Sequence, residues 1–298
     1  MRRWGNSEMS EREVTGQLGI PLRVGLGAVF VLAFLFVVFG GWMWHSSMEE
    51  SHRGLARDMA MAHGQRMGLR VQEAMGAAYM LASLLPQENW EIANFDAIGA
   101  ELLYLFPMVS SVQLAPKGVV SQIYPLRGNE AAIGHDLLKD KDRSQEAFRA
   151  LSRQKLILAG PFNLIQGGTG LAGRFPVFRN DGGRKQEFWG FTIALIRIEG
   201  LLAVAGFSEF SRLGYRYTLC REMEGGECRL FAPIQGNRLE KPVTIPIEVP
   251  SGRWQLSVAP VNGWDPPWYG WPLLALAVLV ATLAASASYL LVSRLRRI

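Results

Sequence analysis

The chain has 298 residues, an apolar share of 49% and a formal net charge of +5. Residues 1–23 carry four arginines against three glutamates, and residues 293–298 carry three arginines and no acid. Of the 31 basic and 26 acidic side chains, 24 and 23 remain between these ends, so the middle of the chain is nearly neutral. Nucleic-acid binding needs a concentrated basic surface, and we therefore predict no nucleic-acid partner.

Two uncharged apolar runs are long enough to cross a bilayer. Residues 24–44 and 271–292 contain 21 and 22 residues, which as helices measure roughly 31 and 33 Å, close to the thickness of the hydrocarbon layer. The first run exceeds the 7–15 apolar residues of a signal peptide, and no small-residue cleavage motif follows it. The sequence predicts two membrane helices, the first an uncleaved anchor.

The charge and aromatic pattern predicts the topology. Arginine-rich ends are typical of the cytoplasmic side, and Trp and Tyr gather where the spans meet the outer surface. These aromatic residues are Trp42, Trp44, Trp264, Trp268, Tyr269 and Trp271. We expect a multi-pass protein of the inner (cytoplasmic) membrane whose large middle region is periplasmic or extracellular.

We divide the chain into seven segments. They are a loosely ordered cytoplasmic N-terminal arm (1–21), a first transmembrane helix (22–44), a stalk helix (45–86), a ligand-sensing domain (87–210), a membrane-proximal β-rich subdomain (211–263), a second transmembrane helix (270–292) and a cytoplasmic tail (293–298).

The stalk helix is predicted because residues 45–85 contain no proline and carry one apolar stripe. The stripe consists of residues spaced three or four apart, namely Met67, Val71, Met75, Ala78, Leu81 and Leu85. The stripe packs either on the chain's own domain or on a second copy; we favour the first and leave a homodimer open. His45, His52 and His63 share one face but are too far apart for one metal ion, and we interpret them as an exposed polar face.

The remaining elements alternate between strands and short helices, which is an α+β pattern. We predict helices at 95–105, 139–154 (with Ala147, Phe148 and Leu151 inward) and 199–205. We predict strands at 110–114, 119–124, 156–158, 170–178, 188–196, 215–220, 228–231, 243–249 and 254–259. An Ala-Pro-Lys-Gly turn joins the first two strands.

Cys220 and Cys228 are the only cysteines, and Glu-Gly-Gly-Glu between them predicts a hairpin turn. Outside the cytoplasm such a pair can oxidise, and no further ligand pair accompanies them. We predict a disulfide and no metal.

The central stretch resembles the CHASE family, the extracellular sensor module of cytokinin receptor kinases and of many bacterial cyclases and kinases. The matching blocks are Pro-Lys-Gly-Val-Val (116–120), Tyr-Pro-Leu (124–126), Gly-Asn-Glu (128–130), Ile-Gly (133–134), Asp-Arg (142–143), Gly-Pro-Phe (160–162), Arg-Phe-Pro-Val-Phe (174–178) and Phe-Trp-Gly-Phe (188–191). They cover about 90 residues, 112–202. The resemblance implies two transmembrane helices around a long stalk helix and PAS-like mixed α/β sensor units, with the ligand in the membrane-distal unit.

The resemblance also implies ligand-binding positions. The acid that corresponds to Asp142 contacts the ligand's purine in the hormone receptors, although Asp142 is equally suited to cap the 139–154 helix. Ala159 stands where the plant receptors carry a threonine, and Ile165 where they carry a leucine. Phe162 lines the cavity or forms its floor. Tyr124 and Arg127 reach the cavity rim, or simply end a half-buried strand.

Arg174 departs most from the family, because the cytokinin-binding receptors have a small hydroxyl residue there. An inward guanidinium needs an anionic partner, since an unpaired buried charge is costly. That partner is either Asp142 or a carboxylate or phosphate of the ligand. We therefore expect a planar or anionic small molecule, not cytokinin itself.

The sequence contains no nucleophile–base pair, so we predict no enzymatic activity and no cofactor. Only six residues follow residue 292, and we expect a separate signalling output protein. Two alternatives stay open: a sensor fragment of a truncated or split diguanylate cyclase or histidine kinase, and a non-sensing structural membrane protein that keeps the fold.

Overall fold

The computed structural model describes residues 8–141, 143–164, 167–180, 186–223, 225–232, 239–264 and 270–295. The chain forms two compact units. One comprises Met1–Gly54 and Asn262–Ile298, and the other comprises Leu55–Val261. Prediction and structure agree that the protein is α+β, with a long leading helix, a C-terminal helix and two antiparallel sheets.

Two helices in the described part of the chain are long and apolar enough to cross a membrane. Helix α1 (Glu8–Leu84) supplies the first apolar stretch, which begins at Val24, and α6 (Gly270–Leu295) supplies the second. Because α1 already begins at Glu8, the expectation of a loosely ordered arm is wrong from that residue onward. In this unit the side chain of Leu273 lies against Gly41, where an added Cβ would collide with it.

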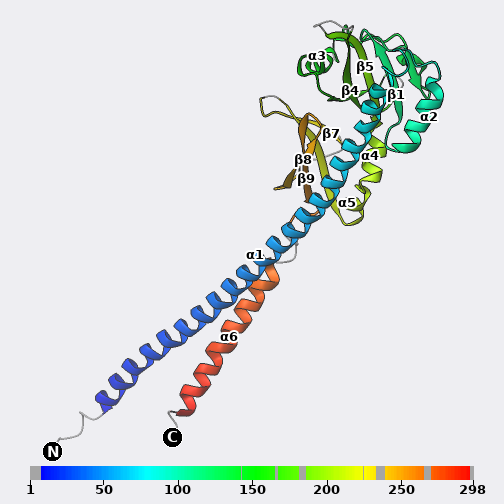
Figure 1. Cartoon of the computed structure of the whole chain (residues 1–298). Helices are drawn as coiled ribbons and strands as arrows, with labels where there is room; N and C mark the ends of the chain where they lie inside the picture. Colours follow the sequence, from blue (N-terminus) through cyan, green and yellow to red (C-terminus); the bar gives the residue numbers. More distant parts are fainter. Residues whose placement is uncertain are drawn as a thin grey trace, which may run out of the picture. The chain divides into compact units, whose positions relative to one another are not determined.

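The larger unit contains a five-stranded antiparallel sheet with the order β2-β1-β5-β4-β3. Figure 1 labels its strands β1, β4 and β5. The strands are β1 (Ser111–Pro116), β2 (Gln122–Tyr124), β3 (Ile157–Asn163), β4 (Thr169–Asn180) and β5 (Gln186–Arg197). The predicted turn joins β1 to β2, with the Gly118 amide donating to the Ala115 carbonyl at 3.0 Å and Pro116 at its second position. Strand β5 is central and buried along most of its length, as expected for a strand covered on both faces.

A second antiparallel sheet has the order β7-β6-β9-β8. Its strands are β6 (Tyr215–Glu222), β7 (Cys228–Ala232), β8 (Val243–Val249) and β9 (Gly252–Pro260). Strand β8 alternates buried and exposed residues, which is typical of a sheet with one solvated face. The predicted disulfide is confirmed: Cys220 and Cys228 are bonded across the β6–β7 hairpin.

The C-terminal part of α1 packs against both sheets. Every residue of its predicted apolar stripe is at most 1% exposed, which confirms that this half of the helix packs on its own domain. Its side chains share one apolar cluster with residues of both sheets, among them Ala194 of the first sheet and Trp254 of the second. Burying each large side chain contributes roughly 1.5–3 kcal/mol to stability.

His63 corrects the prediction of an exposed polar face, because it is only 4% exposed. Its Nδ1 atom lies 2.7 Å from the Ala205 carbonyl, and its Nε2 atom lies 3.3 Å from a Glu209 carboxylate oxygen. These partners come from the region of α4 (Ile198–Val204) and α5 (Ser208–Arg212), which lies between the two sheets in sequence.

The short helices agree with the predictions in part. Helix α2 (Phe95–Leu105) has the predicted bounds, whereas α3 runs only over Ser144–Arg153 and α5 was not predicted. A short 3₁₀ helix, η1 (Glu130–Ala132), was also not predicted. Phe148 was expected to point inward but is 54% exposed, and Ala147 and Ala150 form the buried face of α3 instead.

Candidate functional site

Arg174 lies near the middle of β4, between β5 and β3, and is only 1% exposed. Side chains alternate along a strand, so β4 presents Leu171 and Gly173 to helix α1 and the adjacent Ala172 and Arg174 to the opposite face. Ala172 belongs there to a second apolar cluster that includes residues of α3. The predicted inward guanidinium is therefore buried under α3 and the segment that precedes it.

Few hydrogen bonds satisfy the buried Arg174 guanidinium. Its Nη1 donates to the Arg143 carbonyl at 2.7 Å, while its Nε has no hydrogen-bond partner among the residues that the structure describes. The Phe162 ring centroid lies 5.8 Å from Cζ of Arg174. Burial lowers the Arg174 pKa to about 10; nearby Glu146 opposes this shift, and the Arg143 cation adds to it.

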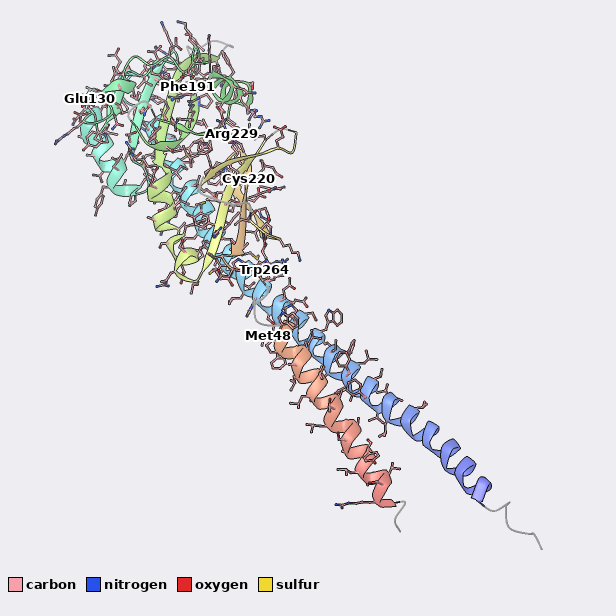
Figure 2. The ribbon with its side chains drawn as sticks, turned by 180° about the vertical axis from the view of Figure 1, so that it is seen from behind. Met48, Glu130, Phe191, Cys220, Arg229 and Trp264 are labelled. Carbon is pink, nitrogen blue, oxygen red and sulfur yellow. A yellow bond between two sulfur atoms is a disulfide. The ribbon has the colours of Figure 1, made fainter. Side chains whose placement is uncertain are left out.

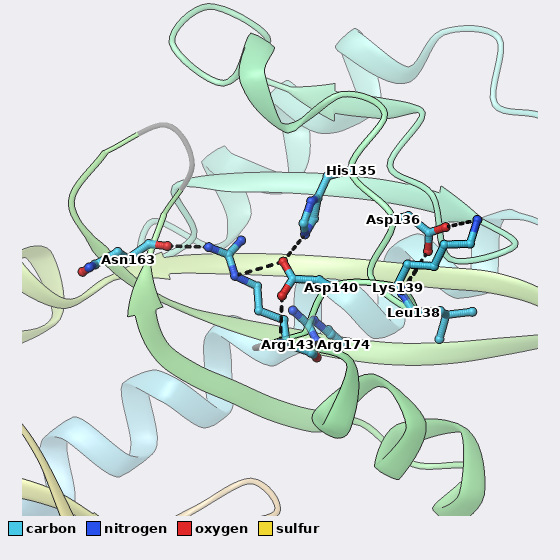
Figure 3. Close-up of polar contacts among 8 residues, drawn as sticks. All are labelled: His135, Asp136, Leu138, Lys139, Asp140, Arg143, Asn163 and Arg174. Atoms are coloured by element: carbon cyan, nitrogen blue, oxygen red, sulfur yellow. Dashed lines mark hydrogen bonds and ion pairs between the residues drawn. The ribbon is translucent and has the colours of Figure 1, made fainter.

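A polar cluster from the segment before α3 surrounds this guanidinium (Figure 3). His135 Nε2 lies 3.1 Å from Asp140 Oδ2, within ion-pair distance but without the alignment of a hydrogen bond. Arg143 Nε lies 3.7 Å from the same carboxylate oxygen, and Arg143 Nη2 donates to the Asn163 carbonyl at 2.6 Å. Burial lowers the pKa of His135; Asp140 opposes this shift, and Arg143 and Arg174 add to it.

Two aspartates fold the segment locally and explain why α3 starts late. The Asp136 carboxylate accepts the amides of Leu138 and Lys139 at 3.0 and 3.2 Å, and the Asp140 carboxylate accepts the amide of Arg143 at 3.0 Å. Such side-chain bonds compete with helical bonds. The helix consequently begins at Ser144, five residues later than the predicted start at Lys139.

A small cavity of about 30 Å³ lies against the Arg174 guanidinium. Its polar and aromatic lining includes Gln113, His135, Arg143, Phe162 and Arg174. A volume of this size holds about one water molecule, whereas sites for drug-sized ligands measure roughly 300–1,000 Å³. The segment that carries His135 and Arg143 therefore covers the arginine closely in this conformation.

The other predicted site residues have different positions. Ala159 is fully buried in β3 opposite Ala172, beside the cavity's strand but not in its lining. Tyr124 contacts Gly99 of α2, and Arg127 is exposed; neither lines the cavity. Asp142 and Ile165 lie outside the described residues.

Sequence reasoning missed His135, Asp140 and Arg143 as a group. Arg143 belongs to the Asp-Arg block (142–143), and His135 directly follows the Ile-Gly block (133–134). The available signal was therefore a group of charged residues lying between these blocks and at their ends. Their convergence on Arg174 depends on local turns that residue spacing alone does not reveal.

In the described part of the chain, two candidate membrane helices flank a region in which a five-stranded antiparallel sheet carries a buried arginine beside a small cavity. Residues 101–217 match the family model of the CHASE domain, as the resemblance predicted. This region is therefore similar to the extracellular sensor domains of signalling receptors, which are non-catalytic modules. No curated protein sequence matches the chain.

Solved structures show the same fold at low sequence identity. The chain is similar to an extracellular ligand binding receptor from Desulfohalobium retbaense DSM5692 (TM-score 0.53, 12% identity, 67% of this chain and 39% of the other). It therefore spans about two fifths of that receptor's length. It is also similar to the extracellular domain of rpHK1S-Z16, described as a histidine kinase (TM-score 0.50, 14% identity, 70% of this chain and 94% of the other).

Proposed function

We propose that this protein is an inner-membrane sensor that binds a small organic anion at Arg174 and passes the signal through its transmembrane helices to a separate output protein. The CHASE match and the extracellular receptor folds support the sensor class. The sheet order β2-β1-β5-β4-β3, with α1 packed on one face, supports a PAS-like membrane-distal unit.

We infer an anionic ligand from the guanidinium of Arg174, which is buried and whose Nε has no hydrogen-bond partner among the described residues. Removing a cation from water is costly unless a charged or hydrogen-bonding partner replaces the water. Guanidinium groups bind carboxylate and phosphate in a planar, bidentate manner. The ring of Phe162 beside Arg174 adds a flat apolar surface, which favours a ligand with a planar part.

Binding requires the segment over Arg174 to open, because the present cavity is too small for a metabolite. We infer that a ligand oxygen replaces the Arg143 carbonyl on Arg174 Nη1 and also reaches Nε. The closed form described here and an open, liganded form then constitute the two states whose populations the ligand shifts.

Helix α1 contacts the back of the same strand. Met75 packs against Gly173, next to Arg174, at a spot where an added Cβ would collide with the methionine sulfur. Thr192 of β5 donates its hydroxyl to the Ala78 carbonyl of α1 at 2.8 Å. A displacement of β4 therefore changes the contacts that the sheet makes with α1, the helix that continues into the first membrane span.

A thermal-shift screen of the full chain in lipid nanodiscs tests the proposal. We expect at least one carboxylate or phosphate metabolite to raise the melting temperature of the wild type, since a ligand that binds only the folded state stabilises it. The same compound should not shift Arg174→Met, whereas the exposed-site control Arg216→Met should respond like the wild type. A shift of equal size in Arg174→Met refutes the role of Arg174.

A further inference from the structure

A second, larger cleft shares Phe162 and Arg143 with the lining of the Arg174 cavity. Its volume is about 510 Å³, within the range of small-molecule sites. It lies between α3 and β3 of the first sheet and the β6–β7 hairpin of the second, and its lining includes Arg143, Glu146, Phe162, Arg221, Arg229 and Phe231. Both sheets belong to the same compact unit.

Two of the lining arginines stand directly opposite each other on neighbouring strands. Arg221 of β6 and Arg229 of β7 are register partners, so their side chains leave the same face of the hairpin. Figure 2 labels Arg229 near Cys220, the residue before Arg221. Like charges in directly opposite positions destabilise a sheet. A pair of this kind therefore needs a compensating negative charge.

Among the described residues, a carboxylate compensates the charge of Arg221 but not that of Arg229. Arg221 is 9% exposed, forms an ion pair with Glu146 at 3.1 Å and donates to the Gly160 carbonyl. Arg229 makes no hydrogen bond or ion pair with any residue in the described part of the chain. It is exposed at the cleft, where a bound molecule can reach it.

Across the cleft, Arg143 adds a third positive charge. Its guanidinium lies 4.7 Å from the Phe162 ring centroid, so the ring and the cation together form one wall. Among the lining side chains that the structure describes, three arginines face one glutamate. The cleft thus has a net positive lining, a volume suited to a metabolite and an aromatic wall.

We propose that this cleft is a second ligand site, distinct from the Arg174 cavity, which binds a small organic polyanion of the di- or tricarboxylate class. One carboxylate pairs with Arg229 and another lies toward Arg143. The ligand bridges the two sheets and holds Phe162, the side chain that also lines the Arg174 cavity. Occupancy of the cleft therefore changes the affinity of the Arg174 site, and linkage requires the reverse effect to be equal.

Isothermal titration of citrate and of succinate into the full chain in nanodiscs tests this site. We expect citrate to bind the wild type more tightly than succinate, and Arg229→Gln to weaken citrate binding by about tenfold, the effect of losing one charge-assisted hydrogen bond. Arg216→Gln, an exposed arginine on β6, is the matched control and should bind citrate as the wild type does. Glu146→Gln should bind citrate more tightly, because it removes the competing carboxylate.

Arg174→Met separates this proposal from the proposed function, because it leaves the cleft arginines in place and should still bind citrate. The cleft proposal is overturned if neither acid binds, if Arg229→Gln binds citrate with wild-type affinity, or if Arg174→Met abolishes citrate binding. A failure of the Arg174 site with citrate binding intact contradicts only the proposed function.

Discussion

Replacing Arg174 by methionine should stabilise the ligand-free protein. The pKa of Arg174 falls on folding from its ordinary value to about 10, mainly through burial, and each pKa unit corresponds to about 1.4 kcal/mol. Holding the charge in the fold therefore costs about 3 kcal/mol. Methionine fills a similar volume without charge, but it leaves the Arg143 carbonyl without its donor, which costs about 1 kcal/mol.

The net expectation for Arg174→Met is an increase of about 2 kcal/mol in the free energy of unfolding. For a unit of this size that corresponds to a melting temperature about 4–8 °C higher. Because the folded-state pKa lies below the unfolded one, the cost is fully present at every pH below 10 and declines only as the pH rises above 10. The gain should therefore be the same at pH 8 and pH 9, well above the titration of His135.

Circular-dichroism melting of the dialysed full chain measures this effect. The control Arg216→Met changes an exposed arginine and should stay within about 0.5 kcal/mol of the wild type. If Arg174→Met instead lowers the melting temperature by several degrees, Arg174 stabilises the ligand-free fold, and the inference of an uncompensated charge fails.

Three further predictions address the fold and its pH dependence. The free energy of unfolding should fall as the pH drops below about 6.5, because the folded-state pKa of His135 is lowered and the unfolded chain takes up the proton first. Urea titrations at pH 7.5 and 5.5 should show a smaller loss of stability in His135→Gln than in the wild type. An equal loss in both contradicts the role of His135. Gly190→Ala should destabilise the fold by roughly 1–3 kcal/mol, since the added Cβ meets the backbone of Ala115 and Pro116. The control Gly252→Ala has open space around the added Cβ and should not destabilise it. Equal effects of the two variants in a thermal melt refute the packing assignment. The double variant Cys220→Ser and Cys228→Ser should lose roughly 2–3 kcal/mol, the value for closing a short loop, and a wild-type urea midpoint would show that the bridge contributes nothing.

Local patterns were sufficient to predict most elements of the fold. Helix α2 and strand β8 have their predicted bounds because proline, turn residues and apolar periodicity mark both ends within the segment itself. The buried stripe of α1 was predictable for the same reason. Helix α3 began late because aspartate side chains bond nearby amides, a competition that propensity alone does not resolve.

The errors arise where distant segments meet. His63 is buried by Ala205 and Glu209, more than 140 residues away in sequence, and nothing in the stalk sequence indicates those partners. The inward placement of Arg174 was predictable from its position in a family block, but His135 and Arg143 join it only through the turns of the intervening segment. The charged pair Arg221 and Arg229 likewise depends on the register of the hairpin.

The central claim, an anionic ligand held by Arg174, is tested most directly by equilibrium titration of the best compound from the thermal-shift screen. We expect Arg174→Met to weaken its binding at least about tenfold, the loss of one charge-assisted hydrogen bond, with Arg216→Met unchanged. Equal dissociation constants for the wild type and Arg174→Met would contradict the claim.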